Sequence, residues 1–563
     1  MIKLSGLRDG INMMKSKIII GACLLCSVLV FSSVMAGCSP GNGEQPQGDC
    51  YYFDSAAADG GDGSQQSPFN ELSCVGQLGL EAGDSLLLKA GSIFTGSLYL
   101  DGISGDEEAP VVVSAYGDTE GEGLPAIDGN GLEGSGVLCI KNCSYITVEN
   151  IELYDSAKSE GDRRGVLVNV TNPLGDDVVT YSGITLKGLY IHDINGITDS
   201  ENSGMSAASK KTGGIHVWSE DGHGRTDGLT ITGCRIDNVD NVGIATWYKP
   251  GTGGDGKISP YRDDFDIYAH SDMLISGNEI SHIGKNGIFA RNLYEGFIQH
   301  NTLFETATTC ISGNTIVTSY VYGTVIQYNE GYYNRATVRP SDGVIQDGCM
   351  LDADLQSRDT VWQYNYSHDN AFGLFLNCTS YDPENGIEDK VTVRYNLSVH
   401  DYGNKGIIYI NYETAGIDIY NNTFIVSAET SPIILKSNSG RRFSFYNNII
   451  YNMSASAEFQ IADTVYAEAG ANLVFNTQGA SIDGLDRFKE ENIGGIYADP
   501  LFEGTYSDDA DRRGMDFAEK FILELHSPAY GTCSDRGFRG NDFFGNPYTD
   551  CIGFYCGVGR DDR

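Results

Sequence analysis

Short runs of alternating apolar and polar residues recur along the middle of the chain, from about Tyr145 to Tyr451. Each repeat contains an apolar strand, a turn with Asn or Gly, a short second strand, and then a third apolar strand that usually follows a Gly. The first two strands read ITVENIEL, LTITGCRI or VTVRYNLS. Apolar residues at every second position predict β-strands, whereas a helical solenoid would need them at a period of about 3.6 residues. Repeated units of three short strands predict the coils of a parallel β-helix.

Polar residues also recur at fixed places in these repeats. An asparagine marks the turn between the first two strands at Asn278, Asn301, Asn329, Asn365, Asn396, Asn422 and Asn448. Buried polar groups are normally hydrogen-bonded, so we interpret these residues as an internal amide ladder between coils. A second set shares another turn register, which indicates a structural role: His192, His282, His368 and His400.

With these repeats the chain resembles the right-handed parallel β-helix superfamily of carbohydrate-active proteins, which contains pectate lyases and polygalacturonases. The resemblance covers roughly residues 50–560. The segment YYFDSAAADGGDG is similar to an N-terminal cap, and Asp499-Pro500-Leu501-Phe502 is similar to the closing part of such proteins. The resemblance implies an all-β, single-stranded right-handed parallel β-helix of about ten coils with long loops over one face, and an activity on carbohydrates.

The first residues predict an export signal. Lys15 and Lys17 precede the apolar run IIIGACLLCSVLVF, which is too short to span a bilayer comfortably. Ala36-Gly37-Cys38 resembles the lipobox of bacterial lipoproteins, with Met35 where Leu is usual. We expect the protein to be exported and anchored by lipidation of Cys38 in the bacterial cell envelope, at the outer membrane or cell surface, or else to be secreted. The predicted divisions are a signal peptide at 1–37, a linker at 38–49, an N-terminal cap with the first coils at 50–135, repeats at 136–460, and C-terminal coils with a cap at 461–563.

The charge balance limits the partners. The 563 residues include 37 Lys and Arg against 76 Asp and Glu, for a formal net charge of −39. A nucleic-acid backbone or an anionic bilayer would approach like charge. We therefore expect no nucleic-acid partner and membrane contact only through the lipid anchor. The expected ligand is a neutral polysaccharide or oligosaccharide, or an anionic one bridged by cations. We also expect a monomer.

The third strand of each repeat is predicted to build the functional face. Its first and third positions are mostly small or apolar and point inward, so its second and fourth positions point outward. Aligned in this way, the fourth position forms one exposed column: Asn169, Trp218, Trp247, Arg291, Asn314, Asp352, Asn377, Ile410 and Lys436.

Two tryptophans in this column suggest sugar binding. Neighbouring coils lie about 4.8 Å apart, so Trp218 and Trp247 are expected to be stacked platforms on which sugar rings pack. We predict that substrate is bound by Trp218, Trp247, His216, Asn314 and Asn377. The alternative is that long turns cover both indoles as packing. The third tryptophan, Trp362, is at an inward position and is expected in the core. Inserted segments at 195–212, 219–227, 248–271 and 334–346 flank the column and are expected to wall a cleft.

The run DGCMLDAD, from Asp347 to Asp354, is the densest group of carboxylates on this face. Asp352 and Asp354 are two residues apart on one strand, so they share a face at a separation of about 6.5–7 Å. One carboxyl that holds a proton and one that is ionised are sufficient for glycoside hydrolysis. We predict that Asp352 and Asp354 are the acid/base pair of a glycoside hydrolase, with Arg291 and Asn314 orienting substrate or stabilising charge. This chemistry requires no cofactor, and the chain after the predicted signal peptide, residues 38–563, shows no CxxC pair or histidine cluster at zinc spacing.

Two alternatives remain open from the sequence. Lyases of the β-helix superfamily use Arg or Lys as the base, and calcium neutralises a uronate carboxylate, so a calcium-assisted polysaccharide lyase would use Arg291. No match to the lyase motifs surrounds Arg291, and the net charge disfavours uronate polymers without metal. A non-catalytic glycan-binding surface solenoid would need only the tryptophans.

Overall fold

The computed structural model describes residues 48–198, 210–249, 256–411, 416–438, 442–462, 466–531, 533, 540–547 and 551–555. The chain divides into two units, Met1–Gln45 and Pro46–Arg563, and all described residues belong to the second. The predicted signal peptide and lipobox, including Cys38, lie outside the described residues. Among those described, no helix has both the length and the hydropathy needed to cross a bilayer.

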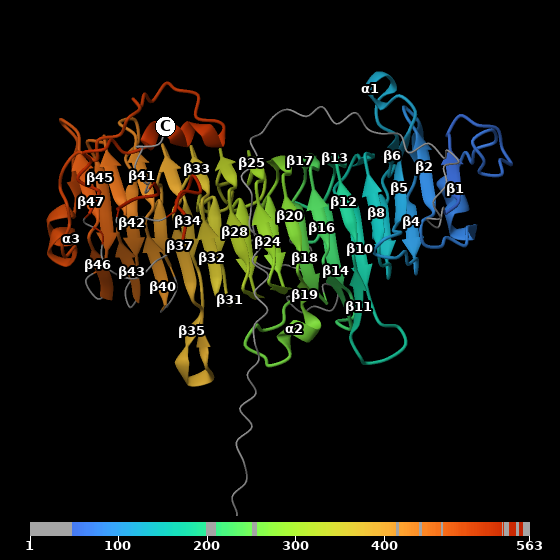
Figure 1. Cartoon of the computed structure of the whole chain (residues 1–563), viewed down its shortest axis with the longest axis horizontal. Helices are drawn as coiled ribbons and strands as arrows, with labels where there is room; N and C mark the ends of the chain where they lie inside the picture. Colours follow the sequence, from blue (N-terminus) through green and yellow to red (C-terminus); the bar gives the residue numbers. More distant parts are fainter. Residues whose placement is uncertain are drawn as a thin grey trace, which may run out of the picture. The chain divides into compact units, whose positions relative to one another are not determined.

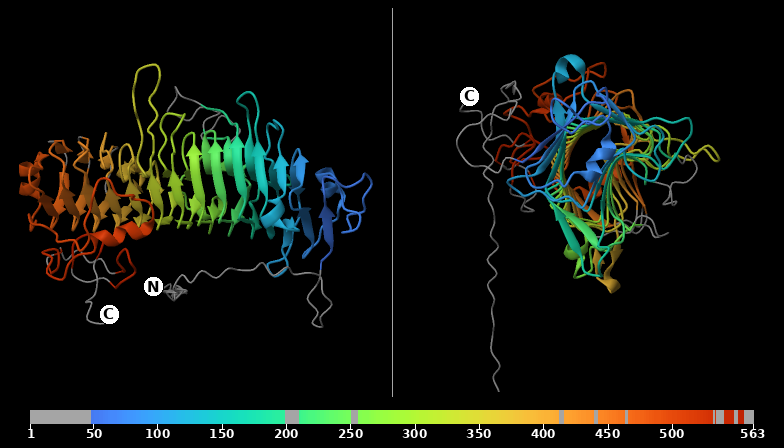
Figure 2. Two further views of the ribbon diagram at one scale, coloured as in Figure 1. Left: turned by 90° about the horizontal axis from the view of Figure 1, so that it is seen from above. Right: turned by 90° about the vertical axis from the view of Figure 1, so that its right-hand side faces the viewer.

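The strands form three long parallel sheets, and each coil of the chain adds one strand to each sheet in turn. β16 (Thr230–Thr232), β17 (Arg235–Val239) and β18 (Val242–Tyr248) follow one another along the chain. Each pairs in parallel with its equivalent one coil later. Figure 1 shows the strands side by side in chain order, and the end-on view in Figure 2 shows the coils wound around a common interior. The predicted all-β parallel β-helix is confirmed.

The sheet that carries the candidate site, called the site sheet, has 13 strands among the described residues. In order they are β4 (Leu98–Asp101), β7 (Leu138–Lys141), β10 (Arg164–Val170), β14 (Gly213–Ser219), β18, β22 (Ile288–Arg291), β26 (Ile316–Ser319), β30 (Leu351–Ala353), β34 (Phe375–Asn377), β39 (Ile408–Ile410), β42 (Ile433–Ser437), β45 (Ala457–Ile461) and β48 (Ile482–Asp483).

Two further long sheets complete the coils. One contains β1 (Cys50–Phe53), β2 (Ser85–Lys89), β5 (Val111–Tyr116), β8 (Ile146–Glu149), β12 (Thr185–Lys187), β16, β20 (Leu274–Ser276), β24 (Phe297–Gln299), β28 (Val325–Gln327), β32 (Thr360–Gln363), β37 (Val391–Arg394), β40 (Ile417–Tyr420), β43 (Arg442–Tyr446) and β46 (Tyr466–Gly470). The other contains β3 (Ile93–Thr95), β6 (Ala126–Asp128), β9 (Glu152–Asp155), β13 (Tyr190–Ile194), β17, β21 (Glu279–Ile283), β25 (Thr302–Phe304), β29 (Glu330–Tyr332), β33 (Tyr366–His368), β38 (Leu397–Val399), β41 (Thr423–Val426), β44 (Ile449–Asn452) and β47 (Leu473–Asn476).

Smaller elements extend the coils locally. A six-stranded sheet contains β11 (Val179–Ser182), β15 (Gly224–Asp227), β19 (His270–Ser271), β23 (Leu293–Tyr294), β27 (Val321–Tyr322) and β31 (Ser357–Arg358). The other short elements are the hairpin of β35 (Tyr381–Asp382) and β36 (Ile387–Glu388), and the helices α1 (Thr119–Glu122), α2 (Phe265–Tyr268) and α3 (Leu485–Glu491). The site sheet has thirteen strands among the described residues, more than the predicted ten coils, because coils before and after the recognised repeats at about 145–451 add strands at both ends.

The interior holds an apolar core and the predicted amide ladder. Trp362 is fully buried, which confirms its predicted place in the core. Asn278 Nδ2 donates to Asn301 Oδ1 at 2.9 Å and to the carbonyl of Ile231 at 3.0 Å. The same pattern repeats through every predicted ladder residue and extends to Asn472 and Asn492. Each such bond contributes about 1 kcal/mol, and together they fix the stacking of the coils.

Candidate active site

The register of the site sheet decides which side chains face outward together. Arg291 pairs with Ser319, and Val317 pairs with Asp352. The strand after β22 is therefore β26, which begins at Ile316. Asn314 precedes this strand, so its predicted place at the fourth position of the strand is wrong. Gly313 lies in a tight turn before β26, where an added Cβ would meet the carbonyl oxygen of Lys285 at 2.7 Å. The segment 305–315 between β25 and β26 was not recognised as longer than its equivalents, so an alignment by sequence alone missed this shift.

The two tryptophans are neighbours, as predicted, but they do not form an open platform. Trp218 pairs with Trp247 across β14 and β18. Trp247 is fully buried against Phe289, with ring centroids 5.5 Å apart, and the Arg291 guanidinium lies 5.2 Å from its centroid. A Cβ at Gly256 would lie 2.6 Å from the indole Cε3 atom, so the main chain there covers the ring. The alternative prediction, that the chain covers the indoles and packs against them, therefore holds for Trp247. Trp218 is half-buried.

Three other predicted site residues lie away from solvent. His216 is fully buried, and burial lowers the pKa of its imidazole well below the ordinary value. Asn377 pairs with the inward-facing Ala353, so the expected exposed position for Asn377 is wrong. Arg291 is 3% exposed, with its Nη2 atom 3.4 Å from Ser319 Oγ. None of the three lines the cavity described next.

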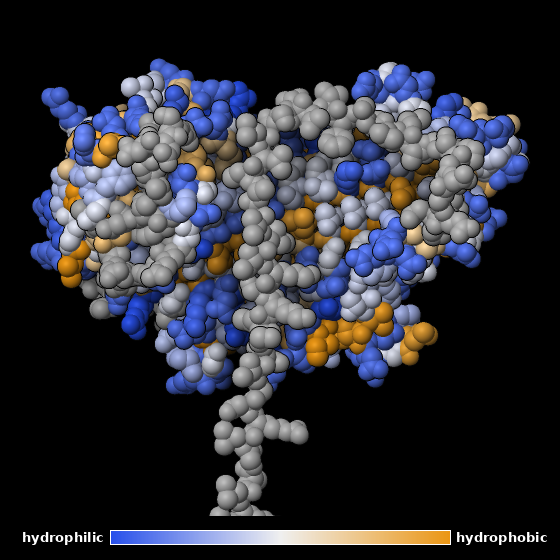
Figure 3. All heavy atoms as spheres, in the orientation of Figure 1, coloured by the Kyte–Doolittle hydropathy of each residue, from blue (hydrophilic) through white to orange (hydrophobic). Residues whose placement is uncertain are grey.

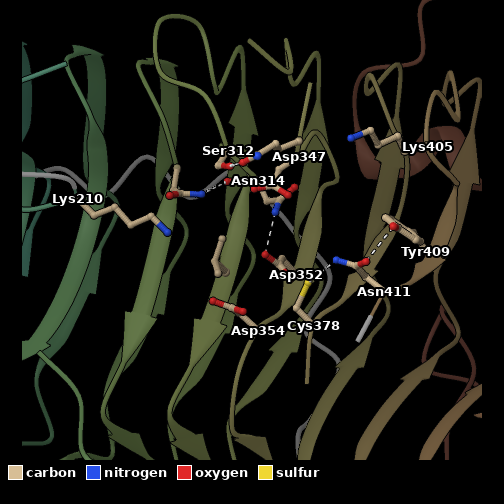
Figure 4. A pocket seen from close by; sticks show the side chains of 13 residues that line it. Lys210, Ser312, Asn314, Asp347, Asp352, Asp354, Cys378, Lys405, Tyr409 and Asn411 are labelled. Atoms are coloured by element: carbon tan, nitrogen blue, oxygen red, sulfur yellow. Dashed lines mark hydrogen bonds between the residues drawn. The ribbon is translucent and has the colours of Figure 1, made fainter. Parts of the chain in front are cut away.

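A cavity of about 410 Å³ opens on the outer face of the site sheet. It brings together three of the predicted residues, Asn314, Asp352 and Asp354, and adds residues from loops before β14, β30 and β39 (Figure 4). The lining residues are Lys210, Asn286, Ser312, Asn314, Val317, Gln346, Asp347, Asp352, Asp354, Cys378, Lys405, Tyr409 and Asn411.

Asp352 is the enclosed carboxylate of this cavity. It is only 6% exposed, although an open position was predicted, and Asn314 Nδ2 donates to its Oδ2 at 2.8 Å. Asn314 Oδ1 in turn accepts from the amides of Gly348 and Cys349, both at 2.9 Å. Burial raises the pKa of Asp352 well above its ordinary value, and the charges of Asp354 and Asp347 raise it further. Asn314 therefore connects the Asp347 loop to a carboxyl group that holds its proton.

Asp347 and Asp354 are the accessible carboxylates. Both are half-buried and line the same cavity, Asp354 directly after β30 and Asp347 in the loop before it. Burial raises the pKa of Asp347, the charge of Asp354 adds to this shift, and the ammonium of Lys210 opposes it. A carboxyl group with a raised pKa beside a second accessible carboxylate is the arrangement used for general acid catalysis.

Sequence reasoning included Asp347 in the acidic run but gave it no role. Its loop position lies outside the strand register that was used to select Asp352 and Asp354. The available signal was its place in the same acidic run, directly after the inserted segment at 334–346.

Comparisons with known proteins agree with the fold. No family model matches the chain. A lacto-N-biosidase of Bifidobacterium longum subsp. longum is 30% identical over 484 residues, which cover 72% of this chain and 29% of that protein. The chain thus spans less than a third of the length of this curated relative.

Two solved structures share the fold of this chain. The native GH136 lacto-N-biosidase from Eubacterium ramulus matches with a TM-score of 0.52 and 21% identity, over 80% of this chain and 67% of that one. Its selenomethionine derivative matches with a TM-score of 0.54 and 22% identity, over 76% and 67% of the two chains. The parallel β-helix of this chain is therefore a fold that it shares with a GH136 lacto-N-biosidase.

Proposed function

We propose that the protein is a glycoside hydrolase that cleaves an oligosaccharide or polysaccharide in the cavity formed around Asp347, Asp352 and Asp354. The observation that carries this proposal is the meeting of two accessible carboxylates and one enclosed carboxyl in a single cavity. Glycoside hydrolysis needs one carboxylic acid to protonate the leaving oxygen. It also needs one carboxylate that attacks the anomeric carbon or activates a water molecule.

The roles follow from access to the cavity. Asp347 is the general acid, because it is accessible and its pKa is raised by burial and by Asp354. Asp354 supplies the ionised carboxylate, which attacks the anomeric carbon or activates a water molecule. Asp352 was predicted to act on substrate, but its enclosure makes it a positioning residue for its two neighbours.

The alternatives have less support. Arg291, the base required by the lyase alternative, is buried outside the cavity. Trp247, one of the platforms required by the non-catalytic alternative, is also buried. The proposed hydrolysis uses carboxyl protons and water, so it requires no metal or other cofactor.

We take a terminal lacto-N-biose unit as the first substrate to test. The curated relative at 30% identity is named for activity on this unit. A volume of about 410 Å³ falls in the range of small-ligand sites, roughly 300–1,000 Å³, and accommodates a short saccharide.

The proposed location follows the N-terminal sequence. Export and lipidation of Cys38 are supported by Lys15 and Lys17, by the apolar run and by Ala36-Gly37-Cys38. The folded domain would then lie at the cell envelope. Mass spectrometry of the mature N-terminus from a bacterial host tests this location: a lipidated Cys38 is expected, and an uncleaved Met1, Met13 or Met14 start would contradict it.

The activity is tested with a panel of oligosaccharides that includes one ending in lacto-N-biose. The wild-type protein is expected to release a saccharide with a new reducing end. Asp347→Asn and Asp354→Asn should each lower kcat by about 10²–10⁴-fold, because each removes a proton-transfer group or nucleophile.

Asp486→Asn is the matched control, because its side chain is 98% exposed on α3, outside the cavity. It should retain wild-type kcat. Release at the wild-type rate by both Asp347→Asn and Asp354→Asn would contradict the proposed roles.

A further inference from the structure

Lys210 approaches the cavity from an unusual backbone position. It precedes β14, is 8% exposed, and has a φ of 62°. Its amide donates to Asn241 Oδ1 at 3.1 Å, and the buried Asn241 donates from Nδ2 to the carbonyl of Ile197 at 2.7 Å. A left-handed conformation in a residue other than Gly costs on the order of 1–3 kcal/mol, and it persists where the surrounding structure fixes it. The backbone thus holds Lys210 in one place.

The side chain of Lys210 points into the cavity (Figure 4). Its Nζ atom lies 4.3 Å from the ring centroid of Phe289. Among the described residues, it makes no direct ion pair. The charged groups that act on it are Asp347, Asp352, Asp354, Lys285 and Arg291.

We infer that Lys210 is a positioning residue that supplies the counter-charge for the carboxylate of Asp354 in the cavity that both residues share with Asp347 and Asp352. This inference rests on the proposed hydrolase function. Three carboxyl groups in one cavity cannot ionise together without a compensating positive charge, because like charges favour the protonated form of one another. A cation fixed at the cavity wall allows one of them to ionise.

The titration of Lys210 agrees with this geometry. Burial lowers its pKa to about 8, Lys285 lowers it as well, and Asp354 opposes the shift. Lys210 is therefore positively charged below about pH 8. In that range it lowers the pKa values of Asp347 and Asp352.

The test is the pH profile of kcat/KM for Lys210→Met. Loss of the positive charge should raise the carboxylate pKa values, so the acid limb should move up by about one pH unit or more. Lys210→Arg, which keeps the charge, should return the acid limb toward the wild-type position.

Lys211→Met is the matched control. Lys211 is the next residue, but its Nζ lies 5.8 Å from the Trp247 ring centroid and it does not line the cavity. Its acid limb should stay at the wild-type pH. A Lys210→Met protein with a raised KM and an unmoved acid limb would overturn the inference, because Lys210 would then bind substrate instead.

A second measurement does not depend on activity. The pKa of Lys210 in the folded state, about 8, lies below the unfolded value of about 10.4. The unfolded wild type binds more protons between these values, so its stability should rise with pH through this window. The Tm of the wild type should rise between pH 8 and 10 relative to Lys210→Met. If Lys210→Met does not fold, Lys210→Arg serves, because its guanidinium stays charged throughout.

A constant Tm difference across this range would show that folding does not lower the pKa of Lys210, and it would overturn the enclosure of its ammonium group in the cavity wall. If the wild type cleaves no sugar but its Tm rises as predicted between pH 8 and 10, the hydrolase function is contradicted. The enclosure of Lys210 in the cavity wall is then still supported. The two failures are therefore distinguishable.

Discussion

The indole of Trp247 is enclosed by Phe289, by Arg291 and by the main chain at Gly256. Its cation–π contact with Arg291 adds to the free energy gained by burying a large apolar ring. Trp247 therefore stabilises the wall beside the cavity and has no open face for a sugar.

Replacement of Trp247 tests this role. Trp247→Ala should lower the free energy of unfolding by about 3–5 kcal/mol, the usual loss for a large buried aromatic residue. Urea denaturation measures the change. Trp218→Ala is the comparison, and its loss should be smaller because Trp218 is half-buried. Equal stability of wild type and Trp247→Ala would show that the ring is not packed as described.

The residues that meet at the cavity could be predicted better than the extent to which each one is enclosed. The acidic run from Asp347 to Asp354 was recognisable from the sequence, and the structure places its carboxylates in one cavity. The enclosure of Asp352 was not predictable, because it depends on Asn314 and on the amides of the loop that precedes β30. Period-2 alternation gives the face of a strand but not what covers that face.

Among the elements, the segment at residues 508–514 makes hydrogen bonds and an ion pair with β29, with β33 and with the residue that follows β33. Arg512 makes a bidentate pair with Asp369 at 2.6 and 2.9 Å, and the Gly514 amide donates to Glu330 at 2.6 Å. His368 lies between Asp369 at 2.7 Å and Glu330 at 3.2 Å. These contacts join residues far apart in the chain, so they stabilise the C-terminal segment against the coils.

The histidine makes this attachment depend on pH. Burial lowers the pKa of His368, but the hydrogen bonds to Asp369 and Glu330 outweigh it and leave the pKa raised. Its contribution to stability is fully present below the unfolded pKa of about 6.5 and is lost as pH rises through the folded pKa.

His368→Gln should therefore lower the free energy of unfolding by about 3–5 kcal/mol below pH 6.5, as expected when one member of a buried charged network is removed. The difference from wild type should narrow as pH increases, and urea denaturation at several pH values measures it. His282→Gln is the control, because His282 occupies the same turn register but is half-exposed. A difference that widens with pH would contradict the assigned charge of His368.

At the scale of the whole molecule, strand order and interior could be predicted, whereas the register across long insertions could not. The asparagine turns fixed successive coils because their spacing is a property of the chain itself. The segment 305–315 between β25 and β26 carries no such turn signal, so Asn314 was predicted within the third strand although that strand begins at Ile316. Hydrophilic residues cover most of the described face shown in Figure 3, in keeping with the net charge of −39.

We propose that the cavity of Asp347 and Asp354 hydrolyses a glycosidic bond. The most direct measurement is cleavage of an oligosaccharide that ends in lacto-N-biose in water enriched with heavy oxygen, followed by mass spectrometry of the products. With the wild type, we expect a new reducing end that carries the heavy oxygen, and with Asp354→Asn we expect this product to be lost. An unsaturated product without the label, or intact substrate bound by both proteins, would contradict it.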